Sequence, residues 1–463
     1  MALIKSISGI RGTIGGRVGE NLTPSDIVKF SAAYGKWLKQ FHNGKKIIIG
    51  RDGRISGDMV SRLVTQTLLA MGIDVADAGL STTPTIEMAV LWEKADGGII
   101  ITASHNPKEW NALKLLNSKG EFISAEDGAF ILEQATLENF DFAPVSGLGQ
   151  YSVNSTFINR HIDAIVNYKW VDVAEIKKRN LKVVVDVINS TGVLSVPPLL
   201  QALGVENFVL INQELNGNFA HNPEPLPEHL TQLCEAVKNI NADLGIAVDP
   251  DVDRLCFVNE DGSLFGEEYT LVAVADYILG KQKGNTVSNL SSTRALKDVT
   301  LKYGCQYTAS AVGEVNVVKK MKAVNAVVGG EGNGGIIIPE LHYGRDALAG
   351  MALFLSAFAL HKGSATVYRK TFPDYFMSKK KMTLDKDIKF SDVATALQKQ
   401  YHQYPFNSED GLKIEMENSW VHLRSSNTEP IIRIYTESFS QEDADRLADE
   451  IISHVEDFCN SHN

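Results

Sequence analysis

The sequence predicts an α/β protein in which three successive α/β units are followed by a smaller α+β domain. Apolar strand-like runs alternate with segments of helical period three times before residue 370, a pattern typical of mainly parallel sheets. After residue 370, amphipathic segments flank short strand-like runs instead. Each of the first three units also ends one strand in an unusual polar or glycine-rich loop. We therefore expect domains over residues 1–150, 151–262, 263–369 and 370–463.

The first unit alternates helices and strands from its beginning. Thr23 is suited to cap a helix whose first residue is Pro24, where proline needs no backbone N–H partner. The apolar period predicts further helices over residues 57–71 and 85–92. Strands are predicted over residues 45–51, 73–76 and 99–101.

The later units follow the same reasoning. The second unit is predicted to have strands at 181–187, 208–211 and 244–248 and helices at 191–203 and 228–240. The third unit is predicted to end in a strand at 326–329. In the last domain we expect helices at 393–401 and 442–458 and strands at 412–415, 420–423 and 431–436.

Composition excludes several classes of protein. The 44% hydrophobic and 22% charged content is typical of a globular protein, and no apolar run approaches membrane-spanning length. A net charge of −11 without any basic run argues against a nucleic-acid partner. The four cysteines are scattered, which indicates neither a disulfide framework nor a zinc motif. We expect a cytoplasmic protein with no membrane partner.

The first unusual loop follows the apolar run 99–101. This strand delivers Thr102, Ser104, His105 and Asn106 onto a loop that Pro107 keeps out of a helix. Ligands of open α/β sheets bind beyond the carboxyl ends of the strands. Ser104 is therefore a candidate nucleophile, and an ordinary polar turn is the alternative interpretation.

The second loop brings together three carboxylates, Asp249, Asp251 and Asp253, after the strand at 244–248. In an extended segment, alternate side chains lie on one side. Crowded carboxylates repel unless a cation lies among them, and oxygen ligands favour Mg²⁺ or Ca²⁺. The pattern predicts a divalent-metal site, and a solvated acidic turn is the alternative.

The same acids resemble the start of an EF-hand, with Glu260 at the twelfth position. Arg254, however, occupies the sixth position, where the calcium loop needs glycine, and the preceding segment is strand-like. We therefore reject the EF-hand. Arg254 beside the acids suits a site that also binds phosphate.

The third loop, residues 330–335, has the form G-x-G-x-x-G. A dinucleotide site would need a helix directly after it, but the next residues are strand-like and end at Pro339, so that interpretation fails. We expect the glycines to let the backbone approach a ligand closely, leaving Glu331 and Asn333 to contact sugar hydroxyls. A flexible glycine-rich hairpin is the alternative.

The fourth loop concentrates anion-binding groups. Arg424, Ser425, Ser426, Asn427 and Thr428 are consecutive, and Arg433 follows on the next strand. A guanidinium binds two phosphate oxygens at once, and hydroxyl and backbone N–H groups can satisfy the others. The loop predicts a phosphate site, and a polar turn between strands is the alternative.

Together the four loops describe phosphoryl transfer on a phosphosugar, and in this order they resemble the α-D-phosphohexomutase family. That family includes phosphoglucomutase, phosphomannomutase and phosphoglucosamine mutase, and the resemblance covers essentially the whole chain. It implies three related α/β domains and a C-terminal α+β domain around a central cleft. It also implies that Ser104 is phosphorylated and that Asp249, Asp251, Asp253 and an oxygen of the phosphoserine bind Mg²⁺.

The resemblance further implies roles in catalysis and substrate binding. The residues that it places near the reacting groups are Arg11 and Lys114. His105, beside Ser104 on its loop, is a further catalytic candidate. The residues that contact the phosphosugar are Glu331, Asn333, Arg254, Arg424, Ser426, Asn427, Thr428 and Arg433. Phosphoserine 104 would give its phosphoryl group to a sugar hydroxyl, and the resulting sugar 1,6-bisphosphate, which also primes the enzyme, would turn over and return the other phosphate. Lys114 is the leading general acid/base, because arginine is too weakly acidic.

Two departures from the family pattern concern specificity. Many relatives end the sugar loop in Ser-Gly-His, but this loop ends Asn333-Gly334-Gly335, so the histidine role is vacant or taken by another residue such as His342. The acid motif reads Asp-Pro-Asp-Val-Asp and keeps all three ligands. The glycine-loop form resembles the phosphoglucosamine mutase-like branch, so glucosamine phosphate is the expected substrate. Broad phosphoglucomutase/phosphomannomutase activity is the alternative.

Two other functions are compatible with the same loops. A phosphatase would result if water reached the phosphoserine, and it would not need bisphosphate priming. A non-catalytic phosphosugar-binding protein needs neither nucleophile nor metal, so Ser104 and the three aspartates argue against it. We expect a monomer or a homodimer.

Overall fold

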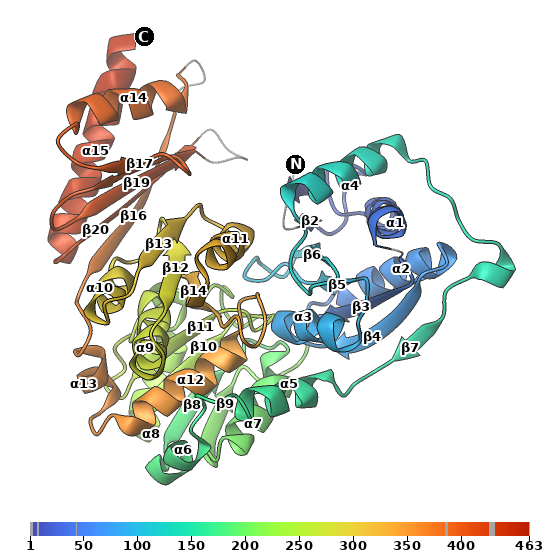
Figure 1. Cartoon of the computed structure of the whole chain (residues 1–463), viewed down its shortest axis with the longest axis horizontal. Coiled ribbons are helices and arrows are strands. Elements are labelled where there is room, and N and C mark those ends of the chain that lie inside the picture. The colour runs from blue at the N-terminus through green and yellow to red at the C-terminus, as the bar shows by residue number, and fades with distance from the viewer. Residues whose placement is uncertain (1–2, 7–8, 43, 385–387, 426–430, 463) are drawn as a thin grey trace.

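The chain forms three α/β domains with mixed sheets, followed by a domain built on an antiparallel sheet (Figure 1). The computed structural model describes residues 3–6, 9–42, 44–384, 388–425 and 431–462. We refer to the domains as I to IV in chain order. Their limits expected from the sequence, 1–150, 151–262, 263–369 and 370–463, stay predictions. No helix in the described residues is long and apolar enough to cross a membrane.

Domain I contains a seven-stranded sheet in the order β1-β2-β6-β5-β3-β4-β7. Its strands are β1 (Leu3–Ser6), β2 (Gly9–Thr13), β3 (Lys46–Arg51), β4 (Asp74–Leu80), β5 (Gly97–Ile101), β6 (Trp110–Leu116) and β7 (Tyr151–Val153). The pairs of β3 with β4 and β5 are parallel, but β5 pairs antiparallel with β6, as do β6 with β2 and β2 with β1. The expectation of a mainly parallel sheet is therefore wrong for one half, because the short connection after β5 returns the chain as an antiparallel neighbour.

The domain I helices are α1 (Pro24–Phe41), α2 (Gly57–Ala70), α3 (Thr83–Trp92) and α4 (Ala125–Leu137). Helices α2 and α3 lie close to their predicted positions and α1 begins as predicted, whereas α4 was not predicted. The Thr23 side chain caps α1 by accepting a hydrogen bond from the Asp26 N–H, with Pro24 in the first turn, as predicted.

Helices cover both faces of the domain I sheet, which explains the uninterrupted apolar runs of β3 and β5. Ile47, Ile49, Ile99 and Ile101 pack into the core formed with α1 and α2. Their alternating neighbours on the same strands, Ile48 and Ile100, pack into a second core with residues of α3. A strand buried on both faces needs apolar residues at every position.

Domain II is a four-stranded sheet in the order β11-β10-β8-β9, in which only β11 runs antiparallel to its neighbour. The strands are β8 (Lys182–Asp186), β9 (Asn207–Ile211), β10 (Leu244–Val248) and β11 (Leu255–Asn259). The helices are α5 (Phe157–Val166), α6 (Val173–Arg179), α7 (Gly192–Ala202) and α8 (Thr231–Ile240). Helix α8 begins later than predicted, because a 3₁₀ turn at Pro227–His229 precedes it.

Domain III repeats this arrangement with the strand order β13-β12-β14-β15. The strands are β12 (Asn285–Asn289), β13 (Tyr307–Ser310), β14 (Ala326–Glu331) and β15 (Gly335–Ile337). The helices are α9 (Glu267–Lys281), α10 (Ala295–Lys302), α11 (Glu314–Val324), α12 (Ala347–Leu360) and α13 (Ala365–Arg369). One apolar core runs through domains II and III, where Phe257 of β11 stacks on Phe354 of α12 with ring centroids 3.7 Å apart.

Domain IV is an antiparallel sheet in the order β16-β20-β19-β18-β17. Its strands are β16 (Phe376–Thr383), β17 (Phe406–Asn407), β18 (Leu412–Glu415), β19 (Trp420–Ser425) and β20 (Ile431–Ser438), and its helices are α14 (Phe390–Gln400) and α15 (Gln441–His462). Its apolar core is formed by its own residues. Figure 1 shows this domain set apart from domain I, with domain III between them.

Candidate active site

Ser104 lies in the connection between β5 and β6, at the end of the buried isoleucine run. Its side chain is buried and its backbone is left-handed, with φ +49°. A non-glycine residue adopts this conformation only where surrounding contacts enforce it. The Thr102 hydroxyl accepts a hydrogen bond from the Ser104 N–H at 2.9 Å.

Arg54, which the sequence analysis did not single out, holds the whole serine loop. Its guanidinium donates to the carbonyl oxygens of Ser104 (2.5 Å), Asn106 and Pro107 (both 2.7 Å) and to that of Trp110 (2.9 Å). Asp52 pairs with Arg54 at 3.0 Å and accepts from the Thr102 hydroxyl at 2.6 Å. The available signal was that Asp52 and Arg54 directly follow β3, whose carboxyl end lies beside that of β5.

The three aspartates lie in a tight turn after β10, not on an extended segment as expected. Val252 between them has φ +60°, and a β-branched residue rarely adopts this left-handed conformation. The hydroxyls of Ser190 and Thr191 donate to the carbonyl of Pro250 at 2.7 and 2.8 Å and fix the turn. β11 follows directly, so the strands on both sides agree with the rejection of an EF-hand.

This turn and the serine loop meet. The Ser104 hydroxyl lies 2.8 Å from Oδ2 of Asp249 and donates a hydrogen bond to it. Asp249, Asp251 and Asp253 are fully buried, and each offers a carboxylate oxygen within 4.8 Å of the others. Oδ1 of Asp251 and Oδ1 of Asp253 are buried without a hydrogen-bond partner in the described chain. Unsatisfied oxygens converging in this way fit a hard divalent cation.

Electrostatics at the triad also favour a cation. Burial, together with Asp251 and Asp253, raises the pKa of Asp249 well above its usual range. Burial alone would raise the pKa of Asp251 as well, but the ammonium group of Lys114 lowers it. A divalent ion among these groups would stabilise all three in their charged form.

Lys114, on β6, supplies the nearest positive charge. Its Nζ lies 2.6 Å from Asp251 and 3.3 Å from Asp253. Burial alone would lower the pKa of Lys114, but these two carboxylates raise it. Lys114 is therefore held as a proton donor, which fits the acid half of its expected acid/base role.

Arg11, His105 and Arg254 lie around the same centre. Arg11 donates to the side-chain oxygen of Asn106 at 2.7 Å. His105 Nδ1 is 3.4 Å from the Ser104 hydroxyl, and burial with the charges of Arg254 and Arg11 lowers its pKa to about 2. Arg254 pairs with Glu224 at 3.1 Å, and its Nε has no hydrogen-bond partner among the described residues. The imidazole of His105 is thus neutral, and the Nε–H of Arg254 is still available to bind an anion.

The glycine loop forms a β-hairpin between β14 and β15, which agrees with the rejection of a dinucleotide site. Glu331 already accepts hydrogen bonds from Asn289 (2.8 Å) and the Gly313 N–H (3.0 Å), and Asn333 accepts from the Gly335 N–H at 3.2 Å.

Two glycines of this loop lie against neighbouring protein atoms. Gly334 has φ +79°, and a Cβ there would overlap the backbone carbonyl of Leu255. A Cβ on Gly332 would overlap the Glu268 carboxylate. The hairpin thus packs tightly against β11, directly beyond the aspartate turn.

Arg345 is a second residue that sequence reasoning missed. It is buried immediately before α12 and contacts Asp253 at 2.8 Å, Glu314 at 2.8 Å and Glu331 at 3.1 Å. It therefore joins the aspartate turn to the glycine loop. Two of its partners, Asp253 and Glu314, lie 92 and 31 residues away in sequence, and only the neighbouring Asp346, a helix-cap residue, gave a local signal.

His342, the candidate to replace the histidine missing from the glycine loop, has both ring nitrogens in contact with protein carboxylates. Its Nε2 lies 3.2 Å from Asp346, and its Nδ1 lies 3.2 Å from Glu87. Both ring nitrogens face buried carboxylates, so neither is directed at a substrate.

The phosphate-loop residues Ser426, Asn427 and Thr428 lie outside the described residues. Arg424 and Arg433 are cross-strand partners on β19 and β20, and Arg424 pairs with Asp410 at 2.8 Å within domain IV. The structure therefore places the two arginines together on domain IV, which Figure 1 shows apart from domain I.

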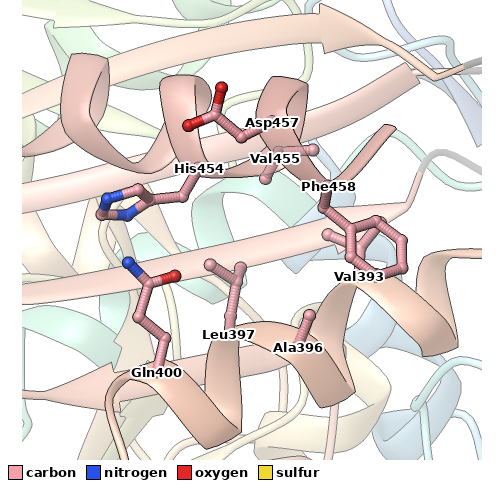
Figure 2. Close-up of a pocket in the computed structure, with 8 residues that line it drawn as sticks. All are labelled: Val393, Ala396, Leu397, Gln400, His454, Val455, Asp457 and Phe458. Atoms are coloured by element: carbon pink, nitrogen blue, oxygen red, sulfur yellow. The ribbon is translucent and has the colours of Figure 1, made fainter. Parts of the chain in front are cut away.

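A separate surface pocket lies between α14 and α15 of domain IV (Figure 2). It has a volume of about 330 Å³, and its lining includes Val393, Leu397 and His454. None of the residues that line it was predicted from the sequence to have a catalytic or binding role.

Four family models match the chain in order and define its class. They describe phosphoglucomutase/phosphomannomutase domain I at residues 4–141, domain II at 159–262, domain III at 266–375 and the C-terminal domain at 380–454. Fold and site thus define an intramolecular phosphotransferase, an isomerase of the phosphohexomutase class.

The relatives extend over the whole chain. A phosphoglucomutase/phosphomannomutase of Thermococcus kodakarensis is 36% identical over 94% of this chain and 95% of its own length. A phosphoglucosamine/phosphogalactosamine mutase of Sulfurisphaera tokodaii is 33% identical over 98% of this chain and 100% of its own. The chain belongs to the α-D-phosphohexomutase family, as its motifs predicted.

Solved structures share the fold. A phosphoglucomutase/phosphomannomutase family protein of Burkholderia thailandensis has a TM-score of 0.84 at 25% identity and covers 98% of both chains. The Aspergillus fumigatus N-acetylphosphoglucosamine mutase in complex with GlcNAc-6P and magnesium has a TM-score of 0.60 at 14% identity, covering 98% of this chain and 96% of that one.

Mg²⁺ is expected to stabilise the protein, because a dication relieves the repulsion among the buried aspartates. At a concentration about 100 times the Kd, binding adds about 2.7 kcal/mol to the free energy of unfolding. Thermal unfolding with and without Mg²⁺ measures the effect. Asp253→Asn should reduce it, whereas Asp261→Asn, on an exposed turn, should retain it. Equal midpoints with and without Mg²⁺ in the unmodified chain would contradict the site.

Arg345→Met is expected to destabilise the protein strongly, because Asp253, Glu314 and Glu331 would keep buried charges without their shared partner. Removing one member of a buried ion pair costs about 3–5 kcal/mol. Arg446→Met, which breaks the exposed pair with Asp443, should cost at most about 1 kcal/mol. Urea unfolding of both variants compares the two costs, and equal midpoints would show that Arg345 does not hold the two loops together.

Proposed function

We propose that the chain interconverts glucosamine 6-phosphate and glucosamine 1-phosphate through a phosphorylated Ser104. The observation that carries this proposal is the 2.8 Å contact between the Ser104 hydroxyl and Asp249 inside the buried acid cluster. A nucleophilic oxygen beside three carboxylates needs a cation before it can hold a phosphoryl group, and the open oxygens of Asp251 and Asp253 could hold that cation.

In the proposed reaction, the phosphoryl group of phosphoserine 104 passes to a sugar hydroxyl and forms a sugar 1,6-bisphosphate. The P–O bond to Ser104 breaks, and the proton of the attacking hydroxyl goes to a neighbouring base or water. After the intermediate turns over, its other phosphoryl group returns to Ser104. A 1,6-bisphosphate from solution would prime unphosphorylated enzyme. Mg²⁺ held by Asp249, Asp251, Asp253 and the phosphoserine would neutralise charge on the transferring group.

The protein's own groups carry the rest of the mechanism. Lys114, held protonated by Asp251 and Asp253, would act as general acid toward the serine oxygen when that oxygen leaves. Arg11, through Asn106, and the neutral His105 would keep the serine loop in place. Arg254, whose Nε is open, would bind the reacting phosphate.

Substrate binding would use the two remaining loops. Glu331 and Asn333 would face the sugar hydroxyls, and Arg424, Ser426, Asn427, Thr428 and Arg433 would hold the phosphate that does not react. The form of the glycine loop and the 33% identical phosphoglucosamine/phosphogalactosamine mutase support glucosamine phosphate. The 36% identical phosphoglucomutase/phosphomannomutase supports glucose and mannose phosphates as the second candidate.

The expected setting of the enzyme also stays a proposal. We propose a cytoplasmic enzyme, monomeric or homodimeric, that acts on small phosphosugars and has no nucleic-acid or membrane partner. The acidic net charge of −11 supports the absence of a nucleic-acid partner.

Ser104→Ala is expected to lower mutase turnover by at least about a thousandfold, because no other side chain can carry the phosphoryl group in the cycle. A coupled assay with a 1,6-bisphosphate activator measures the rate, and intact-protein mass measures loss of the phosphate. Ser118→Ala, on an exposed turn, is the matched control and should keep the normal rate. Near-normal turnover of Ser104→Ala would remove the phosphoserine mechanism.

Glucosamine 6-phosphate is expected to have a kcat/KM at least about tenfold above those of glucose and mannose 6-phosphates, a difference of about 1.4 kcal/mol in transition-state binding. Parallel assays of the three sugars with their matching bisphosphates test this preference. A higher value for glucose or mannose phosphate would favour the second candidate. Release of inorganic phosphate without isomerisation would indicate a phosphatase.

A further inference from the structure

A second buried polar cluster lies outside the proposed catalytic centre, where α3, α5 and α12 meet. Helix α5 packs against both α3 and α12 (Figure 1). The cluster contains His161 on α5, His342 in the segment after β15, and Asp346, which caps α12. All three side chains are buried, with residue exposures of 0%, 4% and 1%. Two imidazoles and a carboxylate from separate segments are therefore buried side by side.

The three side chains direct one atom each at a common point. Oδ2 of Asp346 lies 3.0 Å from Nε2 of His161 and 3.2 Å from Nε2 of His342. One ligand atom from each residue lies within 4.8 Å of the other two. Adjacent ligands of a tetrahedral zinc ion with bonds near 2.0 Å are about 3.3 Å apart, so the two Asp–His spacings already match.

Each side chain also has a second polar neighbour. Nδ1 of His161 lies 2.9 Å from the Thr85 hydroxyl, and Nδ1 of His342 lies 3.2 Å from Oε2 of Glu87. The other oxygen of Asp346 accepts the backbone N–H groups of residues 348 and 349 at 2.9 and 3.0 Å. Metal-binding histidines characteristically use their second nitrogen in this way, which leaves the first directed at the ion.

Glu87 adds a second buried carboxylate to the cluster. Glu87 is fully buried, and neither carboxylate oxygen has a hydrogen bond of good geometry in the described chain. One dication held by two neutral imidazoles would balance the two carboxylates, Asp346 and Glu87.

We propose that His161, His342 and Asp346 bind one Zn²⁺ ion, with Glu87 and Thr85 orienting the two histidines. Imidazole ligands favour zinc over magnesium, so this site is chemically distinct from the aspartate triad. The three protein ligands leave the fourth tetrahedral position for water. The ion would tie domain III to α5 and, through Glu87 and Thr85, to α3 of domain I, and it would fix Asp346 beside Arg345.

Cobalt substitution in the full-length protein tests this proposal. The protein is stripped with a chelator, dialysed into millimolar Mg²⁺ to occupy oxygen ligands, and titrated with Co²⁺ while visible absorption is recorded. We expect one equivalent of Co²⁺ to give the intense bands of a four-coordinate nitrogen-ligated ion, and one equivalent of Zn²⁺ to displace it. Octahedral oxygen ligation gives only weak bands.

Variants locate the site within the chain. His161→Gln and His342→Gln each remove a ligand and should weaken Co²⁺ binding by at least about 100-fold. Glu87→Gln keeps all three ligands and should weaken binding by about 10–100-fold. His221→Gln is the matched control, because it removes another His–Asp pair, with Asp186 at 2.8 Å, and should bind Co²⁺ normally.

Two results would overturn the proposal. One is a folded unmodified protein that gives no intense cobalt bands and retains no zinc, which would show that the cluster shares protons instead of an ion. The other is a cobalt spectrum that persists unchanged in His342→Gln. If the histidine variants do not fold, the titration of the unmodified protein decides alone.

Discussion

Mutual repulsion of three buried carboxylates is the constraint around which this structure is arranged. Two like charges 4 Å apart cost about 4 kcal/mol at the effective dielectric of a protein surface, and Asp249, Asp251 and Asp253 are fully buried. The opposing charges come from other domains: Lys114 from β6 of domain I and Arg345 from the segment before α12 of domain III. The charge balance of one turn therefore depends on the packing of three domains, and any separation of those domains would leave the acids uncompensated.

The same packing sustains strained backbone on both sides of the proposed reaction. Ser104 and Val252 both have left-handed φ angles, and such conformations cost about 1–3 kcal/mol each. Arg54 fixes the serine loop by donating to four of its backbone carbonyls. In the aspartate turn, the N–H of Ala347 donates to the carbonyl of Val252 at 3.2 Å. These contacts place the serine hydroxyl against Asp249 before any ligand arrives. The backbone strain at Ser104 and Val252 is therefore the consequence of holding the serine loop and the aspartate turn against each other.

Local interactions made most of the fold predictable, whereas contacts distant in sequence did not. The start of α1 follows from Thr23 and Pro24, and β10 has its predicted bounds because its apolar run ends abruptly at Asp249. The serine, the aspartates and the glycine loop were identified for the same local reason. Arg54 lies 50 residues from Ser104, and Arg345 lies 92 from Asp253, so nothing in either neighbourhood indicated its partner. The antiparallel half of the domain I sheet was not predicted either. The alternation of helices and strands in the sequence does not indicate that β6 pairs antiparallel with β5.

The apolar cores show which domains are packed together. Domain IV, which carries two of the predicted phosphate-binding arginines, has a core separate from that of domains II and III. Domains II and III share one core, so moving one against the other would expose large apolar surfaces. Domain IV has its own core, and the contacts that join it to domain III include polar ones, such as Ser291 with His422 at 2.9 Å and the Val312 N–H with Asp410 at 2.9 Å. Such hydrogen bonds exchange with water at small net cost. In the proposed reaction the intermediate must present each end in turn to one nucleophile. That would require the arginines on β19 and β20 to change position relative to Ser104 while the serine, the acids and Lys114 keep their geometry.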